Sequence, residues 1–305
     1  MALAVAVVLW GTTFVASDSA LGSMSPAVLT VARFAVALTV LAPVAVARGG
    51  LVTALRSPPV ALLGATGVAA YYGLQNLGLV TAGAGTAAVL QAVLPVATAL
   101  IAVVWLRERL SRGVVAGLAL ASVGVSLVAG KVAAEASPGA ALIAVGVLAY
   151  AFYTVLLRQQ PARDPFVLAA ATCSWGLIFL LPWLAEDLLV GRARFDVHPE
   201  SIGVLLYLGL AASALTLLLW TYGASRVPAA TAGAFTAAIP AVGYLCAVIL
   251  GEPNSWAKTA GSGLALLGAA IAARAGSPAS DPRTRDSQSP KHEAAAVSLD
   301  HRGAD

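Results

Sequence analysis

Charged residues are scarce in this chain of 305 residues: they make up 10% of it, whereas hydrophobic residues make up 59%. A soluble domain carries about 25% charged residues. A soluble protein of this length would lack the polar side chains needed to cover its surface. The composition therefore favours lipid as the solvent for much of the chain.

Cysteine and histidine are scarce too. The two cysteines, Cys173 and Cys246, both lie in apolar runs, which excludes a disulfide framework and indicates small buried side chains. Two of the three histidines, His292 and His301, lie in the polar C-terminal tail. The sequence contains no Cys/His metal-ligand spacing, nucleophile elbow or phosphate-binding loop. We therefore expect no metal, no cofactor and no catalytic residue. Basic residues occur singly in short loops, which argues against nucleic acid as a partner.

Long apolar runs dominate the sequence. A hydrocarbon core of about 30 Å requires roughly 20 apolar residues per helix. Ten segments meet or approach this length, and we expect an all-α polytopic membrane protein with ten transmembrane helices. These segments are residues 2–20, 28–47, 60–79, 86–106, 114–130, 138–157, 166–190, 201–222, 229–250 and 258–273. Charges, prolines or glycines mark the joints between them, including the stretch from Gly83 to Gly85. No basic residue precedes the first run, so we expect it to be an uncleaved span.

The basic residues predict the orientation, because cytoplasmic loops are enriched in Lys and Arg. One side holds Arg48, Arg56, Arg107, Arg109, Arg112, Arg158, Arg163 and Arg226. The other side holds Arg33, Lys131, Arg192, Arg194 and Lys258. We expect a multi-pass protein of the inner (plasma) membrane with both termini in the cytoplasm. Residues 275–305 are rich in Ser, Pro and charge, and are expected to form a disordered cytoplasmic tail.

The chain contains an internal repeat. Residues 85–95 read GTAAVLQAVLP and residues 230–240 read ATAGAFTAAIP, so that Thr86 corresponds to Thr231 at an offset of 145. Two five-span halves follow, residues 1–130 and 138–274. Because five is odd, the second half must enter the membrane in the opposite orientation. Inverted repeats of this kind are typical of transporters, which alternate access to a site near the middle of the membrane.

Each half keeps one proline in its fourth span, Pro95 and Pro240. Proline removes a backbone donor and clashes with the carbonyl four residues earlier, so it bends or breaks a helix. The bend has two interpretations: a gate that moves during transport, or a static kink that shapes packing.

Short motifs in order resemble the EamA group of the drug/metabolite transporter superfamily: Trp10-Gly11-Thr12-Thr13-Phe14, Arg33-Phe34, the two repeated runs, Arg107-Glu108-Arg109-Leu110 and Leu250-Gly251-Glu252. The resemblance covers roughly residues 1–274. It implies a basket of ten helices, with the first four of each half around a central cavity and the fifth packed outside. The chain departs from the family pattern in two places. The first repeat has Arg107 where the second has Gly251, and Arg33 has no clear counterpart in the second half.

Polar and aromatic side chains inside the spans are the candidate solute contacts, because a buried amide in hydrocarbon needs partners and should face the interior of the bundle. We expect a cavity lined by Trp10, Thr13, Tyr71, Gln75, Asn76, Gln91, Tyr150, Tyr153, Trp175 and Trp220. For each aromatic residue the alternative is packing or an interfacial position.

Ionisable residues are expected at the ends of spans, with none at mid-depth, so the sequence shows no proton relay and no acidic cluster for an intramembrane enzyme. Asp18 and Arg33 should lie on the outer side, where they could pair or guard a mouth. Glu108 and Glu252 should lie on opposite faces, as gate latches or as solvated helix ends. Paired glycines indicate close helix packing, with a homodimer seam as the alternative; they are Gly113, Gly117, Gly124, Gly261 and Gly268.

The sequence thus predicts an alternating-access transporter, and the resemblance implies small metabolites such as amino acids as its solutes, with export as the expected direction. Multidrug efflux on the same scaffold is the alternative, and a structural or sensory membrane protein is the alternative from a different class.

Overall fold

The structure, a computed structural model, describes residues 1–129, 137–160, 163–249 and 255–276. These residues form helices and no strands, apart from one isolated bridge between Met24 and Phe195. The first part of the chain forms α1 (Ala2–Leu21), α2 (Pro26–Arg48), α3 (Leu51–Leu55), α4 (Pro58–Gly64), η1 (Ala65–Ala70), α5 (Tyr71–Gln91), α6 (Val93–Leu106) and α7 (Arg112–Ala129). The second part forms α8 (Pro138–Arg158), α9 (Pro165–Leu189), α10 (Pro199–Leu206), η2 (Tyr207–Leu215), α11 (Thr216–Ala224), α12 (Ala229–Thr236), α13 (Ile239–Ile249) and α14 (Trp256–Ala275).

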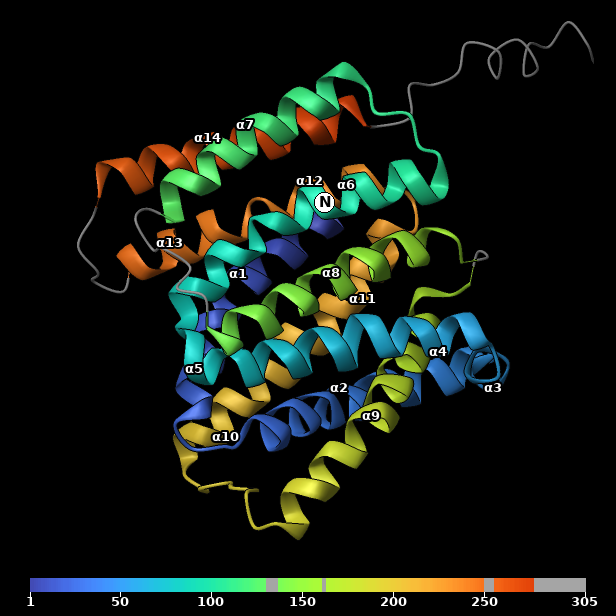
Figure 1. Cartoon of the computed structure of the whole chain (residues 1–305). Helices are drawn as coiled ribbons and strands as arrows, with labels where there is room; N and C mark the ends of the chain where they lie inside the picture. Colours follow the sequence, from blue (N-terminus) through green and yellow to red (C-terminus); the bar gives the residue numbers. More distant parts are fainter. Residues whose placement is uncertain (130–136, 161–162, 250–254, 277–305) are drawn as a thin grey trace, which may run out of the picture.

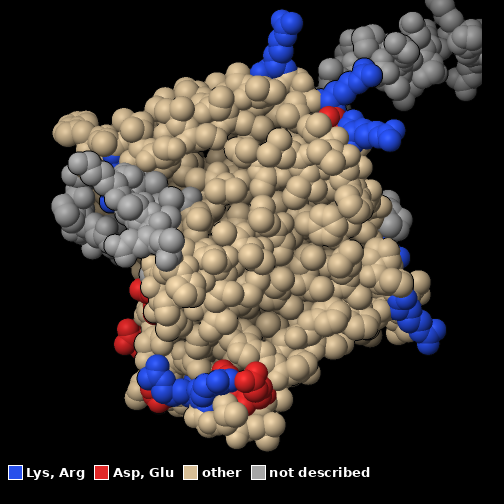
Figure 2. Space-filling model, viewed as in Figure 1, with Lys and Arg blue, Asp and Glu red and all other residues tan. Residues whose placement is uncertain are grey.

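Six helical segments of the described chain are long and apolar enough to cross a membrane: Ala2–Leu21, Pro26–Arg48, Pro138–Arg158, Pro165–Leu189, Pro199–Ala224 and Ala229–Cys246. The other four expected spans are helical as well, and the count of ten transmembrane helices stays a prediction. Charged side chains lie along the margins of the face in Figure 2 and leave its broad middle free of charge. The chain is therefore an all-α, multi-pass membrane protein.

Five helices begin with proline (α2, α4, α8, α9 and α10). Proline suits this position because the first N–H groups of a helix have no partner within the helix. At the start of α9, Asp164 accepts hydrogen bonds from the N–H of Phe166 and of Val167, and it pairs with Arg48 at 2.8 Å. Partial burial acts to raise the pKa of Asp164, but the hydrogen bonds from Arg48 and the helix N–H groups outweigh it and lower the pKa.

The two long helical segments at the third position of each half contain wide π turns at matching places. Adding 145 to the bounds of η1, residues 65–70, gives residues 210–215, which lie within η2. Regular α-helix resumes at Tyr71 and at Thr216, which are again 145 residues apart. The sequence repeat is therefore also a repeat of local backbone structure.

The joint expected between Gly83 and Gly85 is wrong, because α5 continues to Gln91. A glycine costs a helix only about 1 kcal/mol, whereas a proline removes a backbone hydrogen bond and clashes with the carbonyl four residues earlier. Helices α2 and α9 continue past Pro43 and Pro182, but the helices before Pro95 and Pro240 do not continue. Helix α5 ends at Gln91, four residues before Pro95, and α12 ends at Thr236, four residues before Pro240. Each helix thus stops at the carbonyl with which the proline ring would clash. The predicted bend is confirmed as a break, and its role as a gate stays a prediction.

Helices α7 and α14 lie side by side as an outer layer of the bundle (Figure 1). Glycine makes their contact possible. A Cβ atom on Gly124 would lie 2.5 Å from the carbonyl oxygen of Gly261, and one on Gly117 would lie 2.6 Å from that of Gly268. The close helix packing expected of these glycines therefore occurs within the chain, where each glycine face is covered by the helix from the other half.

This packing predicts that Gly268→Leu destabilises the protein. A Cβ atom at Gly268 would lie 2.5 Å from both the nitrogen of Ala121 and the carbonyl oxygen of Gly117. Forcing a larger side chain into such a contact typically costs about 1–3 kcal/mol. Thermal unfolding in detergent should show a lower midpoint for this variant. Gly263→Leu on the same helix is the matched control, because a Cβ there meets nothing within 4 Å. Equal midpoints for the two variants would contradict the proposed contact.

Candidate functional site

A group of aromatic and amide side chains fills the space between α1, α5, α8 and α11. We call it the central cluster; it comprises Trp10, Tyr71, Tyr72, Gln75, Gln91, Tyr150, Tyr153 and Trp220. All of its members are buried, with at most 6% of any side chain's surface exposed. The structure thus brings together seven of the expected solute-contacting residues, from both halves of the chain, and adds Tyr72.

Hydrogen bonds order one end of the central cluster. The Nε2 atom of Gln91 donates to the hydroxyl of Tyr71 at 2.7 Å and to Oε1 of Gln75 at 3.0 Å. The indole Nε1 of Trp10 donates to the hydroxyl of Tyr72 at 3.0 Å. Gln91 is the last residue of α5, so the break before Pro95 holds this amide at the cluster.

The ring of Tyr150 lies at the middle of the central cluster. Its centroid lies 4.5 Å from Tyr71, 5.0 Å from Tyr153, 5.5 Å from Trp10 and 6.0 Å from Trp220. Edge and tilted contacts at these distances are favourable for aromatic pairs. The aromatic side chains of the two halves are therefore in direct contact with one another.

Several polar atoms of the central cluster have no hydrogen-bond partner. They are Oε1 of Gln91, the hydroxyls of Tyr150 and Tyr153, and Nε1 of Trp220, all buried. Buried polar groups in proteins are almost always paired, and an unpaired one calls for an explanation. Unpaired donors and acceptors of this kind in an aromatic setting suit a small solute that carries polar groups on an apolar body.

Three expected contact residues lie outside the central cluster. Asn76 donates to the hydroxyl of Thr30 at 2.9 Å and so joins α5 to α2. Thr13 donates to the carbonyl of Trp10, within its own helix. Trp175 donates to the carbonyl of Leu55. The three side chains are thus held by contacts outside the central cluster, although Oδ1 of Asn76 has no partner. Their contact with a solute stays a prediction.

Arg33 differs from its expected place. The sequence puts it at an outer mouth, free to pair with Asp18, but its side chain is wholly buried, whereas Asp18 is exposed. Its Nε donates to Oγ of Ser213 at 2.9 Å, and its Nη2 lies 3.3 Å from the carbonyl oxygen of Ala212. The four ion pairs found in the described part of the chain do not include Arg33. The exposed position expected for Arg33 is therefore wrong, and the absence of ionisable side chains at mid-depth of the membrane stays a prediction.

Glu108 connects the two halves. Helix α12 begins after Pro228, a residue that has no side-chain acceptor for the free N–H groups of the first turn. The carboxylate of Glu108 supplies both acceptors: Oε1 accepts from Ala229 N at 2.9 Å and Oε2 from Ala230 N at 3.2 Å. Glu108 is thus a helix cap supplied from the other half of the chain. Its expected counterpart, Glu252, lies outside the described residues.

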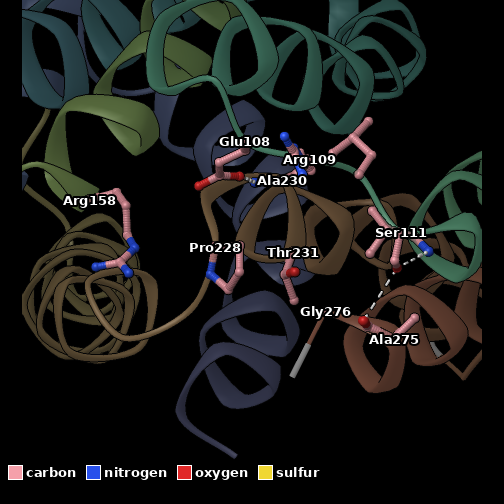
Figure 3. A pocket seen from close by; sticks show the side chains of 11 residues that line it. Glu108, Arg109, Ser111, Arg158, Pro228, Ala230, Thr231, Ala275 and Gly276 are labelled. Atoms are coloured by element: carbon pink, nitrogen blue, oxygen red, sulfur yellow. Dashed lines mark hydrogen bonds between the residues drawn. The ribbon is translucent and has the colours of Figure 1, made fainter. Parts of the chain in front are cut away.

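A pocket of about 340 Å³ opens beside this cap. Figure 3 shows Glu108 and Arg109 on one side of it, with Pro228 and Thr231 opposite and Ala275 at its edge. Ser111 closes that edge by donating to the carbonyl of Ala275 at 3.3 Å. The pocket adjoins the N-terminus of α12, so a movement of this helix would change its shape.

Comparison with known proteins identifies the family. The model of the EamA-like transporter family matches residues 1–130 and 137–274. The chain belongs to the EamA-like transporter family. An uncharacterized transporter of Archaeoglobus fulgidus is 31% identical over 274 residues, which cover 89% of this chain and 97% of that protein. A probable terminal-alkyne amino-acid exporter of Streptantibioticus cattleyicolor is 33% identical over 274 residues, which cover 88% of this chain and 89% of that protein.

The fold of this EamA-like transporter also matches a solved crystal structure. The TM-score is 0.74 at 23% sequence identity, and the match covers 94% of this chain and 98% of the other. At this identity the likeness concerns the fold alone.

Two features of this EamA-like transporter were not predictable from its sequence. The burial of Arg33 depends on the close contact of α2 with η2, which brings together residues 180 positions apart in the chain. The capping role of Glu108 depends on a helix start 121 residues further along the chain. Pro228 followed by a helix without a capping side chain is the one local signal that a distant acceptor is needed.

The Glu108 cap predicts a local effect of substitution. Glu108→Ala leaves the N–H groups of Ala229 and Ala230 without acceptors, and loss of a cap costs about 1 kcal/mol. Hydrogen exchange at these two amides should become roughly fivefold faster. Arg109→Ala, on the same loop, is the control and should leave their exchange unchanged. Unchanged exchange in Glu108→Ala would show that the carboxylate does not cap α12.

Proposed function

We propose that this transporter exports small metabolites such as amino acids across the inner membrane, by alternating access between two halves, residues 1–130 and 138–274. Each half has five membrane-crossing helices, and the two are inserted in opposite orientations around the central cluster. Residues 275–305 form a cytoplasmic tail, nearly all of which lies outside the described residues. The central cluster carries the proposal, because both halves build it and its buried polar atoms retain unused hydrogen-bonding capacity.

A repeated helix junction supports the two-half arrangement. A Cβ atom on Gly209 would lie 3.1 Å from the carbonyl oxygen of Arg33 and 2.6 Å from Cβ of Val36. A Cβ atom on Gly64 would lie 2.8 Å from the carbonyl oxygen of Thr172 and 2.5 Å from Cβ of Trp175. The two glycines are 145 residues apart, and the two contacted positions are each shifted by 139, the offset of Pro26 and Pro165. The same junction is therefore built twice, each time between a helix of one half and a helix of the other.

Export of amino acids is favoured by two observations. The relative from Streptantibioticus cattleyicolor is named as a probable exporter of an amino acid. The amide and phenol groups of the central cluster offer both donors and acceptors, which a zwitterionic solute with an apolar side chain requires. Multidrug efflux is the alternative, and transport of bulky organic cations would indicate it.

The opposite insertion of the halves predicts the topology. With Cys173 and Cys246 replaced by alanine, Glu200→Cys should react with a membrane-impermeant thiol reagent applied to intact cells. Arg109→Cys should react only after the cells are opened. Both substituted side chains are exposed, so accessibility to the reagent decides the result. Labelling of both positions from the same side would contradict the arrangement of the two halves.

Transport itself is tested by counterflow into liposomes that contain the purified protein. A panel of amino acids and of bulky organic cations should show movement of amino acids. Gln75→Ala should slow this movement about three- to tenfold without loss of expression, because it removes the acceptor of the Gln91 amide. Gln159→Ala is the matched control, since this exposed amide contacts only Trp105 among the hydrogen bonds of the described chain.

The outcomes separate the alternatives. Movement of the organic cations alone would favour multidrug efflux. Movement of neither class would count against solute transport by this protein. Gln75→Ala kinetics identical to those of the parent would assign Gln75 to packing.

A further inference from the structure

Arg33 is a buried cation with an unused donor. None of its side-chain surface is exposed, and Nη1 has no hydrogen-bond partner. Its other contacts are neutral: Ser213, the carbonyl of Ala212, and the faces of two aromatic rings, with the guanidinium carbon 4.7 Å from the Tyr72 centroid and 5.6 Å from that of Phe34. Burial of an ion in this way is strongly unfavourable unless a charge of opposite sign accompanies it.

No carboxylate of the described residues balances this charge. The acidic side chains that form ion pairs there are Asp164, Glu186, Asp187 and Asp196, and their partners are Arg48, Arg192 and Arg194. Glu108 is engaged in capping α12, and Asp18 is exposed. Ionisable side chains inside membrane proteins usually mark a solute or ion pathway.

The second half of the chain contains an equivalent helix junction that shows whether packing requires an arginine at the position of Arg33. The junction of α2 with η2 at Gly209 is repeated by the junction of α9 with η1 at Gly64. In the repeated junction, Thr172 stands where Arg33 stands in the first. The same close contact of helices is therefore made without a charge, so packing alone does not require a guanidinium at this position.

We infer that Arg33 binds the carboxylate group of the transported solute, an inference that rests on the proposed function. A carboxylate would pair with the free Nη1 and would replace the long contact of Nη2 with Ala212, which completes the two-pronged geometry that arginine favours. Tyr72 connects this position to the central cluster, since its ring faces Arg33 and its hydroxyl accepts from Trp10. The apolar part of the solute would lie among the aromatic rings once the halves separate.

The experiment compares matched pairs of solutes: phenylalanine with its C-terminal amide, and leucine with its amide. Counterflow into liposomes and quenching of intrinsic tryptophan fluorescence are both measured, because Trp10 and Trp220 lie in the cluster. The wild-type protein should prefer the acid over the amide by about ten- to a hundredfold, as expected for a hydrogen bond between charged groups. Arg33→Gln should lose this preference, and Arg33→Lys should keep part of it. Arg226→Gln removes an exposed arginine and should retain the full preference.

Three results would overturn the inference. Equal movement and equal quenching by acid and amide in the wild type would do so, and this comparison needs no variant to fold. An Arg33→Gln protein that remains monodisperse and keeps the preference would do so too, as would an equal loss in Arg226→Gln. If neither solute moves but the acid still quenches in an Arg33-dependent manner, carboxylate binding stands and the proposed transport function fails.

Discussion

A lipid bilayer offers no water to a polar group, so each backbone and side-chain donor must find its partner within the chain. This constraint explains why the described residues are helical and why α12, which starts after a proline, takes its cap from Glu108 in the other half. It also makes the exceptions conspicuous. Unpartnered atoms of Gln91, Tyr150, Tyr153, Trp220 and Arg33 are among these exceptions and lie in or beside the central cluster, whereas others, such as those of Thr231 and Ser262, lie elsewhere in the bundle.

The two halves share a backbone plan but not its chemical content. The π segments, the glycine contacts and the helix breaks before Pro95 and Pro240 recur at fixed offsets. The side chains at equivalent positions of the two halves differ. Gln75 of the first half corresponds to Trp220 of the second, and Arg33 corresponds to Thr172. The two halves thus differ in what they contribute to the interior: each supplies one tryptophan and two tyrosines to the central cluster, but Arg33, Gln75 and Gln91 all come from the first half.

Much of this plan can be predicted from the sequence, because it depends on local rules. The bends at Pro95 and Pro240 follow from the sterics of proline at repeated positions, and the close pairing of glycine-bearing helices follows from the spacing of the glycines. Pro43 and Pro182 show that a proline by itself does not end a helix. The joint placed at Gly83 to Gly85 fails because glycine weakens a helix without ending it. Most of the central cluster was also predictable, since amides and tyrosines within apolar runs must face inward. The burial of Arg33 and the cap by Glu108 depend on contacts more than 100 residues apart, which no local pattern encodes.

The π segments η1 and η2 determine the direction in which several side chains of the central cluster point. A π turn holds more residues than an α turn, so one additional residue rotates everything beyond it by about 100° relative to an uninterrupted α-helix. Tyr71 and Tyr72 follow η1 directly, and Trp220 lies five residues beyond η2. The direction in which these side chains point is thus set by the number of residues per turn in η1 and η2. A change of η1 to regular α-helix would rotate the tyrosine rings away from Tyr150, and the same change in η2 would rotate the ring of Trp220 away from it.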